Sequence, residues 1–276
     1  MCYFPALSEL LTSFLFAALF FVSGMLWAVE PPSQNTAVDE LKQLNDQTII
    51  RTNLSLGSEW NHFEHGEEKA IWTLAGLYGW RVSDQQDWGI RFRLPFIYKR
   101  TDQPSDEVDV GGVGDAEIGV GTAFRLNDTW RTAGGIELHA DTASDRGFAE
   151  EVWRLKWGWG VSHDVTRWLS FAPSADYNRS IAEKNNASPQ SYFELSLPAT
   201  LILPQHWSMS AKYKTAADFE NGDRWSHTLS AGVAKRLSNL PLVLSATLEK
   251  PLGHSTKKFR VSFTVTYYFQ RYHAHK

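Results

Sequence analysis

The chain has almost no cysteine, no excess of basic residues and no long apolar run beyond its first thirty residues. Cys2 is the only cysteine among 276 residues, so no disulfide can form within the chain. The formal net charge is −4 at pH 7 and no basic stripe or nucleic-acid motif is present, so we expect no nucleic-acid partner. After residue 30 no stretch approaches the roughly 20 apolar residues of a spanning helix, which excludes a helical membrane domain there.

The first thirty residues have the pattern of an export signal. Residues 10–26 form an apolar run that ends near the small residue Ala28, although Glu9 replaces the usual positive charge before it. We expect a signal peptide over residues 1–28, either cleaved near Ala28 or retained as an anchor. A polar periplasmic leader is expected at 29–46, with a short helix within 37–45.

From residue 47 onward the side chains alternate between apolar and polar. In the last segment Phe259, Val261 and Phe263 alternate with Arg260 and Ser262. A period of two predicts β-strands. About twelve such segments occur, near 47–60, 69–82, 87–100, 112–126, 129–141, 152–162, 168–177, 191–203, 206–215, 224–235, 241–250 and 257–269.

Strand length and loop length together indicate a membrane barrel. Most segments have ten residues or more, about the length that a tilted strand needs to cross a bilayer, and short turns alternate with longer polar loops, including one at 101–111. The sequence therefore predicts an all-β fold, an antiparallel transmembrane β-barrel of about 12 strands over 47–269, with a periplasmic tail at 270–276. We expect the Gram-negative outer membrane as its location, with outer-membrane lipids, lipopolysaccharide and the barrel-assembly machinery as partners.

Tryptophan is abundant, with 12 residues, and most of it lies beside the predicted turns and loops. Indole rings at these positions are typical of the aromatic girdles at the two membrane–water interfaces. The alternative, a Trp-rich β-sandwich or sugar-binding domain, would place them toward strand centres. The predicted girdle consists of Trp60, Trp72, Trp80, Trp88, Trp130, Trp153, Trp168, Trp207 and Trp225.

The charged residues of the strands fall on the face opposite the apolar one. A Lys or Arg facing lipid at mid-membrane would cost roughly 2–4 kcal/mol, so these side chains are expected to face the lumen. Both signs occur, which leaves open either a narrow polar channel for a small-molecule solute or a structural barrel whose lumen is closed by salt bridges. The residues expected to shape selectivity are Arg91, Arg93, Asp115, Glu117, Arg131, Glu137 and His139.

Residues 111–121 (GGVGDAEIGVG), followed by Phe124-Arg125-Leu126, resemble a strand of a bacterial outer-membrane family. This is the MetA-pathway phenol-degradation or transporter-like β-barrel family. The resemblance covers roughly residues 47–269. It implies an outer-membrane protein that passes small molecules, including hydrophobic or aromatic ones. The same glycines lack the Lys-Ser/Thr of a phosphate-binding loop.

An enzyme is the rival hypothesis, because outer-membrane phospholipases and acyltransferases place a Ser and a His at the barrel rim. Ser226 and His227 are adjacent near such a rim, but neighbouring side chains on a strand point to opposite faces. His62, Glu64 and His65 have no spacing typical of a closed metal site. We therefore expect no catalytic residue, no metal and no cofactor.

Overall fold

The structure is a computed structural model, and it describes residues 34–64, 68–103, 106–145, 148–185, 187–220, 224–253 and 257–269. The expected signal peptide (1–28), the start of the leader (29–33) and the tail (270–276) lie outside the described residues.

Apart from one helix, α2 (Gln34–Gln43), and a short 3-10 turn, η1 (Pro204–His206), the described residues form strands. The strands are β1 (Asn53–Phe63), β2 (Glu68–Ser83), β3 (Gln86–Gln103), β4 (Asp106–Val113), β5 (Ala116–Arg125), β6 (Trp130–Ala140), β7 (Val152–Thr166), β8 (Leu169–Phe171), β9 (Ser174–Glu183), β10 (Ser191–Leu203), β11 (Trp207–Asp218), β12 (Arg224–Arg236), β13 (Leu242–Leu252) and β14 (Lys257–Tyr268).

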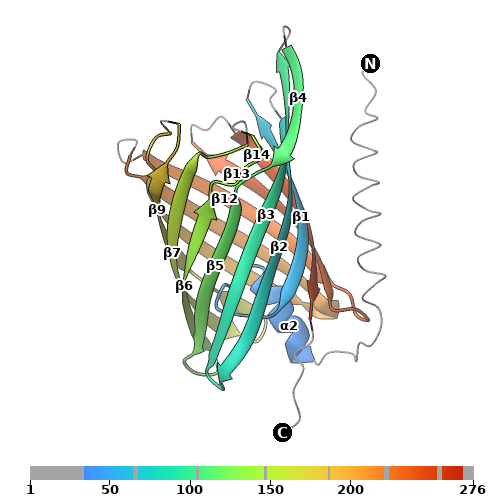
Figure 1. Ribbon diagram of the computed structural model, residues 1–276. Helices are drawn as coiled ribbons and strands as arrows, with labels where there is room; N and C mark the ends of the chain where they lie inside the picture. The colour runs from blue at the N-terminus through green and yellow to red at the C-terminus, as the bar shows by residue number, and fades with distance from the viewer. Residues whose placement is uncertain are drawn as a thin grey trace, which may run out of the picture.

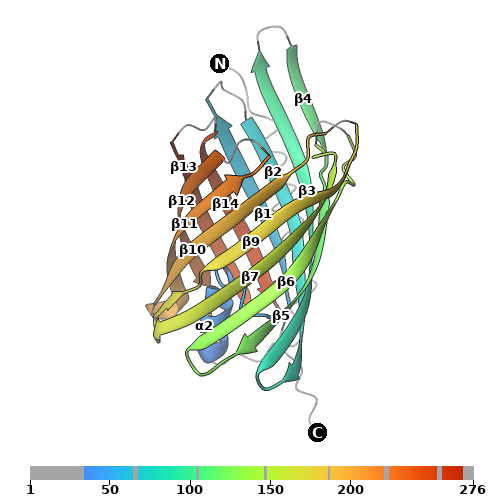
Figure 2. The same ribbon diagram turned by 90° about the vertical axis from the view of Figure 1, so that its left-hand side faces the viewer.

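All strands belong to one antiparallel sheet that closes on itself (Figures 1 and 2). The last strand, β14, pairs with β1, where Tyr268 lies opposite Asn53. Strands β4 and β5 are two parts of one interrupted barrel strand, because both pair with β3. In the same way, β8 and β9 together form one interrupted strand between β7 and β10. With each interrupted pair counted as one strand, the barrel has twelve strands, which confirms the predicted fold class.

Side chains alternate between an outer and an inner face along the wall. On β12, Ser230, Ala234 and Arg236 are buried, whereas Leu229 and Val233, at odd-numbered positions, are exposed. The outer face carries many exposed large apolar residues from most of the strands. An apolar band that continues around the whole wall requires a surrounding of lipid, and the polar residues then face the interior.

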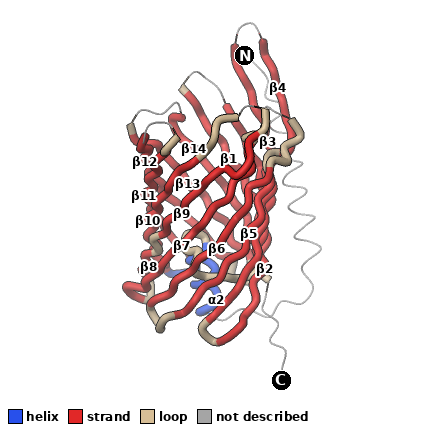
Figure 3. The backbone as a smooth tube through the Cα atoms, turned by 60° about the vertical axis from the view of Figure 1, so that its left-hand side comes forward, coloured by secondary structure: helices blue, strands red, loops and turns tan. Residues whose placement is uncertain are grey.

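The connections differ in length at the two ends of the barrel (Figure 3). Residues 84–85 join β2 to β3 at one end, whereas residues 141–151 join β6 to β7 at the other. Short turns face the periplasm in outer-membrane barrels, so we call the first end periplasmic and the second end external.

Two details of the wall differ from the expectation. Residues 101–111 do not form a simple loop, because the pairing of β3 with β4 continues to Gln103 opposite Asp106 and makes a hairpin that extends above the rim (Figure 1). The segment predicted as one strand at 112–126 is interrupted between β4 and β5. There the Asp115 carboxylate accepts hydrogen bonds from the backbone of residues 142, 143 and 150, which pulls the chain out of the sheet.

Helix α2 and residues 44–52 lie inside the barrel at its periplasmic end (Figures 1 and 3), and we call residues 34–52 the plug. Leu41 is buried against Ala234, Val243 and Tyr268, all on the inner face of the wall. In the described part of the chain, no helix has the length and apolarity needed to span a membrane.

Candidate functional site

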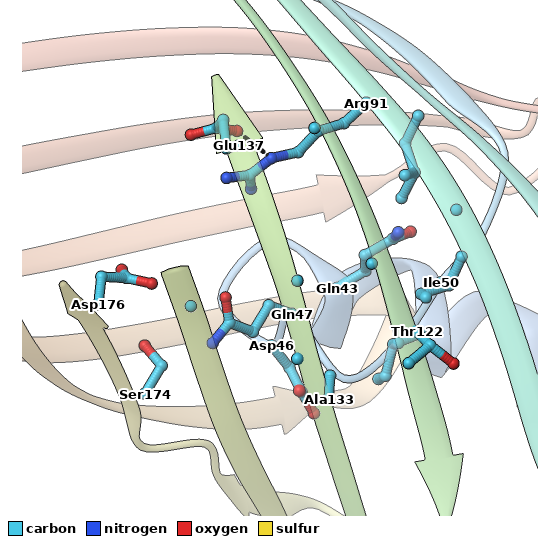
Figure 4. A pocket seen from close by; sticks show the side chains of 18 of the residues that line it. Gln43, Asp46, Gln47, Ile50, Arg91, Thr122, Ala133, Glu137, Ser174 and Asp176 are labelled. Carbon is cyan, nitrogen blue, oxygen red and sulfur yellow. Dashed lines mark ion pairs between the residues drawn. The ribbon is translucent and has the colours of Figure 1, made fainter. Parts of the chain in front are cut away.

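Arg91 of β3 and Glu137 of β6 form an ion pair on the inner face of the wall (Figure 4). Gly119 of β5 lies opposite both residues in the sheet, so no side chain separates them. A Cβ at Gly119 would lie 3.2 Å from the Glu137 Cβ and 3.4 Å from the Arg91 Cγ. On the other side, the Lys156 Nζ lies 3.7 Å from Glu137 and 3.6 Å from Asp176.

His139 connects this pair to its neighbours. Its Nε2 lies 3.2 Å from Glu137 Oε1, and its Nδ1 lies 2.8 Å from Arg154 Nη2 and 3.4 Å from Glu117 Oε1. A neutral imidazole with its proton on Nε2 satisfies the first two contacts, because Nε2 then donates to Glu137 and Nδ1 accepts from Arg154. Arg93 Nη1 donates to Glu117 at 3.0 Å.

The ion pairs continue to the seam between the first and last strands. Arg93 lies 3.9 Å from Glu59 of β1, and Arg260 of β14 lies 3.3 Å from the same carboxylate. Arg260 also donates to Glu249 of β13 at 2.5 Å. The network thus spans the inner face from β7 to β13, and opposite charges neutralise each other along it.

Five of the seven predicted selectivity residues lie in this network, and two do not. The five are Arg91, Arg93, Glu117, Glu137 and His139. Asp115 instead holds the backbone of the loop after β6. Arg131 lies toward the periplasmic end, where its Nη2 is 3.5 Å from Asp164.

The plug is fixed to the wall by a buried ion pair that the sequence analysis missed. Arg236 Nε of β12 donates to Glu40 Oε2 of α2 at 2.6 Å, and both residues are 1% exposed. Arg51 lies 3.6 Å from the same carboxylate, and the Tyr268 hydroxyl donates to the Glu40 carbonyl at 2.9 Å. Burial raises the pKa of Glu40 even though Arg236 opposes the shift.

A second set of contacts holds the plug on the opposite wall. Lys42 Nζ lies 2.5 Å from Asp164, and the Thr48 hydroxyl lies 2.8 Å from that of Ser162. Asp46 accepts from the Thr48 backbone at 2.8 Å, and burial raises the pKa of Asp46. The strand predicted at 224–235 stopped one residue before Arg236, and its alternation, extended by that residue, would place Arg236 on the inner face. The partner that the sequence analysis missed was the plug helix with Glu40.

Two cavities lined by described residues lie against the plug inside the barrel. The first, of about 410 Å³, lies between plug residues 43–50 and the wall of β3, β5, β6 and β7 (Figure 4), where glycines replace side chains. The second, of about 330 Å³, lies against β11–β14, and nine of its twenty lining residues are Ser or Thr. Lys212 lines both cavities.

Glu117, Glu137 and His139 place one possible ligand atom each within 4.8 Å of the others, the distance range of a metal site. Each carboxylate already contacts an arginine, so a divalent cation would compete with Arg91 and Arg93 for the same oxygens. Transition metals also need an imidazole nitrogen free of other donors, whereas Nδ1 accepts from Arg154. The chemistry of this donor set favours ion pairing over metal binding.

The predicted girdle tryptophans lie near the two ends of the wall. Those beside the periplasmic turns are Trp80, Trp88, Trp130, Trp168 and Trp207, and those beside the external loops are Trp60, Trp72, Trp153 and Trp225. Trp157 and Trp159, which the prediction left out, lie within β7 on its outer face, and Trp159 donates to the Thr132 hydroxyl at 3.0 Å.

The Ser226–His227 pair considered for an enzyme is divided between the two faces of β12. His227 Nδ1 lies 2.8 Å from the hydroxyl of Tyr213, the neighbouring residue on the outer face of β11. Ser226 lies on the inner face of β12, the same face as the buried Ser230. The two side chains cannot form a nucleophile and its base.

A closed barrel with an apolar outer band, aromatic residues at both rims and a charged interior is an outer-membrane β-barrel, which confirms the predicted location. No family model matches the sequence, and no curated protein matches it. Several solved structures are similar to the fold of this chain. The COG4313 outer membrane channel from Pseudomonas putida F1 matches with a TM-score of 0.65 at 13% identity, covering 80% of this chain and 96% of that one.

Two further structures have the same architecture. The beta domain of the Bordetella autotransporter BrkA has a TM-score of 0.53 at 14% identity, covering 80% of this chain and 100% of that one. The NanC porin has a TM-score of 0.53 at 12% identity, covering 79% and 100%. At these identities the likeness establishes the fold, which serves both porins and autotransporter domains.

Proposed function

We propose that the protein is an outer-membrane channel for small solutes, and that the plug closes its periplasmic end in the state described. The observation that supports this proposal is that two cavities lie inside the barrel, directly against a short, mostly polar segment, so the interior is not filled by a packed apolar core. A barrel of twelve strands is wide enough to leave such space.

The lining of the second cavity favours a polar solute, because Ser and Thr are its most frequent residues. The first cavity is lined by charged residues and glycines together with apolar side chains such as Ile50 and Leu77. The hydrophobic or aromatic solutes implied by the sequence resemblance would leave these polar groups without hydrogen bonds. The five lumen residues from Arg91 to His139 would then set selectivity through a largely neutralised field, with no covalent chemistry.

The plug contacts support a gate that opens by undocking. Residues 34–52 are held by discrete side-chain contacts on two opposite walls rather than by membership of the sheet. Such a segment can leave while the ring of strands stays closed.

A reversible cross-link tests the proposal. In a Cys2→Ser background, Leu41→Cys with Val243→Cys joins two residues of the buried cluster between plug and wall. In planar bilayers we expect low conductance when this variant is oxidised and higher conductance after reduction. Leu41→Cys with Leu244→Cys is the matched control, because Leu244 is 41% exposed on the outer face. Absence of conductance in every state, together with no solute uptake by liposomes, would show a closed structural barrel instead.

A further inference from the structure

Lys212 of β11 is a cation on the lumen face of the wall. It lies opposite Pro198 of β10 and Ser230 of β12 in the sheet, and its side chain has no hydrogen bond or ion pair with any described residue. The inner face alternates, so Lys214 has the same orientation, but the Lys214 Nζ lies 3.2 Å from Glu194. Lys212 is therefore an ammonium group that lines both cavities and forms no ion pair with a described residue, although the charges of Glu249 and Glu194 act on it from further away.

The carboxylates around Lys212 are already committed to other cations. Glu249 accepts from Arg260 at 2.5 Å, and Asp176 lies 3.6 Å from Lys156. A lysine in a partly desolvated lumen favours an anion that enters and neutralises it, and its three donors suit a carboxylate or phosphate oxygen. The first requirement on a ligand at this position is a negative charge.

Unused hydroxyl groups extend from Lys212 across the wall of the second cavity. They come from β11, β13 and β14, and have no side-chain hydrogen bond within the described part of the protein. Six of them are Ser208, Ser210, Ser245, Thr247, Ser262 and Thr264. A single small anion at Lys212 would leave most of these groups unused, whereas a solute with several hydroxyls would pair with them.

Aromatic side chains are nearly absent from this cavity. Among the described residues, Tyr268 is the only aromatic one that lines it, and its hydroxyl already donates to the plug at Glu40. Stacking of an aromatic or hydrophobic solute therefore has little support here. The second requirement on a ligand is a surface rich in hydroxyl groups.

We propose that Lys212 and the hydroxyl wall of β11–β14 bind hydroxylated carboxylates of the sugar-acid class, with the carboxylate on the Lys212 Nζ and the hydroxyls along the wall. The inference deepens the proposed function and rests on it for the route by which a solute enters and leaves. The binding site itself is complete within the described barrel.

Three probes test separately whether a ligand needs a negative charge and whether it needs several hydroxyl groups. The full-length barrel in detergent is titrated with gluconate, with the neutral polyol sorbitol and with acetate, which has the charge but no hydroxyls. Gluconate is expected to bind about tenfold or more tighter than either, because a charged hydrogen bond contributes roughly 1.5–3 kcal/mol and each 1.4 kcal/mol is tenfold in affinity. Equal affinity for gluconate and sorbitol, or for gluconate and acetate, overturns the proposal.

Matched variants locate the site. Lys212→Met should weaken gluconate binding by about 10- to 100-fold, and Lys212→Arg should retain most of it. Lys214→Met changes the same face of the same strand and should have a much smaller effect, because that lysine is paired with Glu194. Ser245→Ala with Thr247→Val should weaken gluconate binding and leave acetate unchanged. Unheated gel mobility confirms that each variant is folded, and gluconate binding by Lys212→Met equal to that of the unmodified protein refutes the assignment.

Binding in detergent tests the Lys212 site, and conduction in bilayers tests the proposed channel, so the two proposals can be refuted independently. A barrel that binds gluconate without ever conducting contradicts the proposed channel and leaves the site intact. A barrel that conducts without binding gluconate contradicts the site and leaves the channel intact.

Discussion

Arg236 and Glu40 form an ion pair between the barrel wall and the plug, with 2.6 Å between Nε and Oε2. Both side chains are almost completely buried, at 1% and 2% exposure, at the periplasmic end of the barrel. Loss of one partner from such a pair leaves an uncompensated buried charge, which is far more costly than loss of the pair as a whole.

Arg236→Met should therefore weaken plug docking by roughly 3–5 kcal/mol and raise the open probability of the channel. Glu40 stays buried in this variant, with Arg51 at 3.6 Å as its nearest remaining cation. The double variant Arg236→Met/Glu40→Gln should recover most of the docking. Single-channel recordings measure both, and an unchanged open probability in Arg236→Met would show that the ion pair does not fix the plug.

Docking should weaken as the pH rises. Burial raises the pKa of Glu40 above its ordinary 4.5, with Arg236 and Arg51 opposing the shift and Asp39 adding to it. A raised pKa means that the docked state binds a proton more tightly than the released state. The contribution is fully present below about pH 4.5 and is lost as the pH rises through the docked pKa.

Asp46, whose pKa burial also raises, acts in the same direction; Thr48, Ser162 and Arg131 oppose that shift. Open probability between pH 4 and pH 8 is the measurement. Glu40→Gln removes the titrating carboxyl and should flatten the pH dependence, while the buried Arg236 that it leaves without a carboxylate weakens docking at every pH. Tighter closure at high pH than at low pH would contradict the sign.

Gly89→Val should displace the plug by steric overlap. A Cβ at Gly89 would lie 3.0 Å from the Ile50 Cγ2 of the plug and 3.0 Å from the Leu77 Cδ1 of the wall. Overpacking of this kind costs typically 1–3 kcal/mol. Because the plug is not part of the sheet, we expect it to move rather than the wall, and limited proteolysis at residues 34–52 should accelerate.

Gly134→Val is the control for this steric prediction. Gly134 lies on the outer face of β6, and a Cβ there would meet its nearest atom, the Gly158 carbonyl oxygen, at an ordinary 3.6 Å. Proteolysis should match that of the unmodified protein. If both valine variants accelerate cleavage equally, the barrel itself is destabilised and the close contact with Ile50 is not the cause.

Phe263→Lys should destabilise the folded barrel in lipid vesicles by about 2–4 kcal/mol, because Phe263 is 59% exposed on the lipid-facing side of β14. Ser262→Lys changes the adjacent residue, which faces the lumen and its water, and should cost much less. Urea unfolding followed by tryptophan fluorescence measures both. The reverse order would mean that the inner and outer faces are exchanged.

The sequence predicted the wall and missed the plug for a physical reason. Alternation along a strand is a local signal, so Phe263 and Arg260 reveal their faces without knowledge of the partner strand. The plug depends on contacts such as Glu40 with Arg236, 196 residues apart, which no local period records. The hairpin above the rim and the interruption at Asp115 were missed for the same reason, since both depend on which backbone groups meet in space.

The candidate site was predicted only in part. Alternation along the strands placed Arg91 and Glu137 on the inner face. Their direct contact is possible because Gly119, which lies between them in the sheet, has no side chain to separate them. Lys212 was an inward residue among many, and its lack of a partner becomes visible only when its neighbours are seen to be paired with one another.

The docking surface of α2 is assembled from the last three strands of the chain. Ala234, Val243 and Tyr268 come from β12, β13 and β14, and Tyr268 lies at the seam opposite Asn53, the first residue after the plug. A chain whose seam has not yet joined offers the helix only part of this surface. Helix α2 therefore gains its complete docking surface only when β12, β13 and β14 are paired with one another.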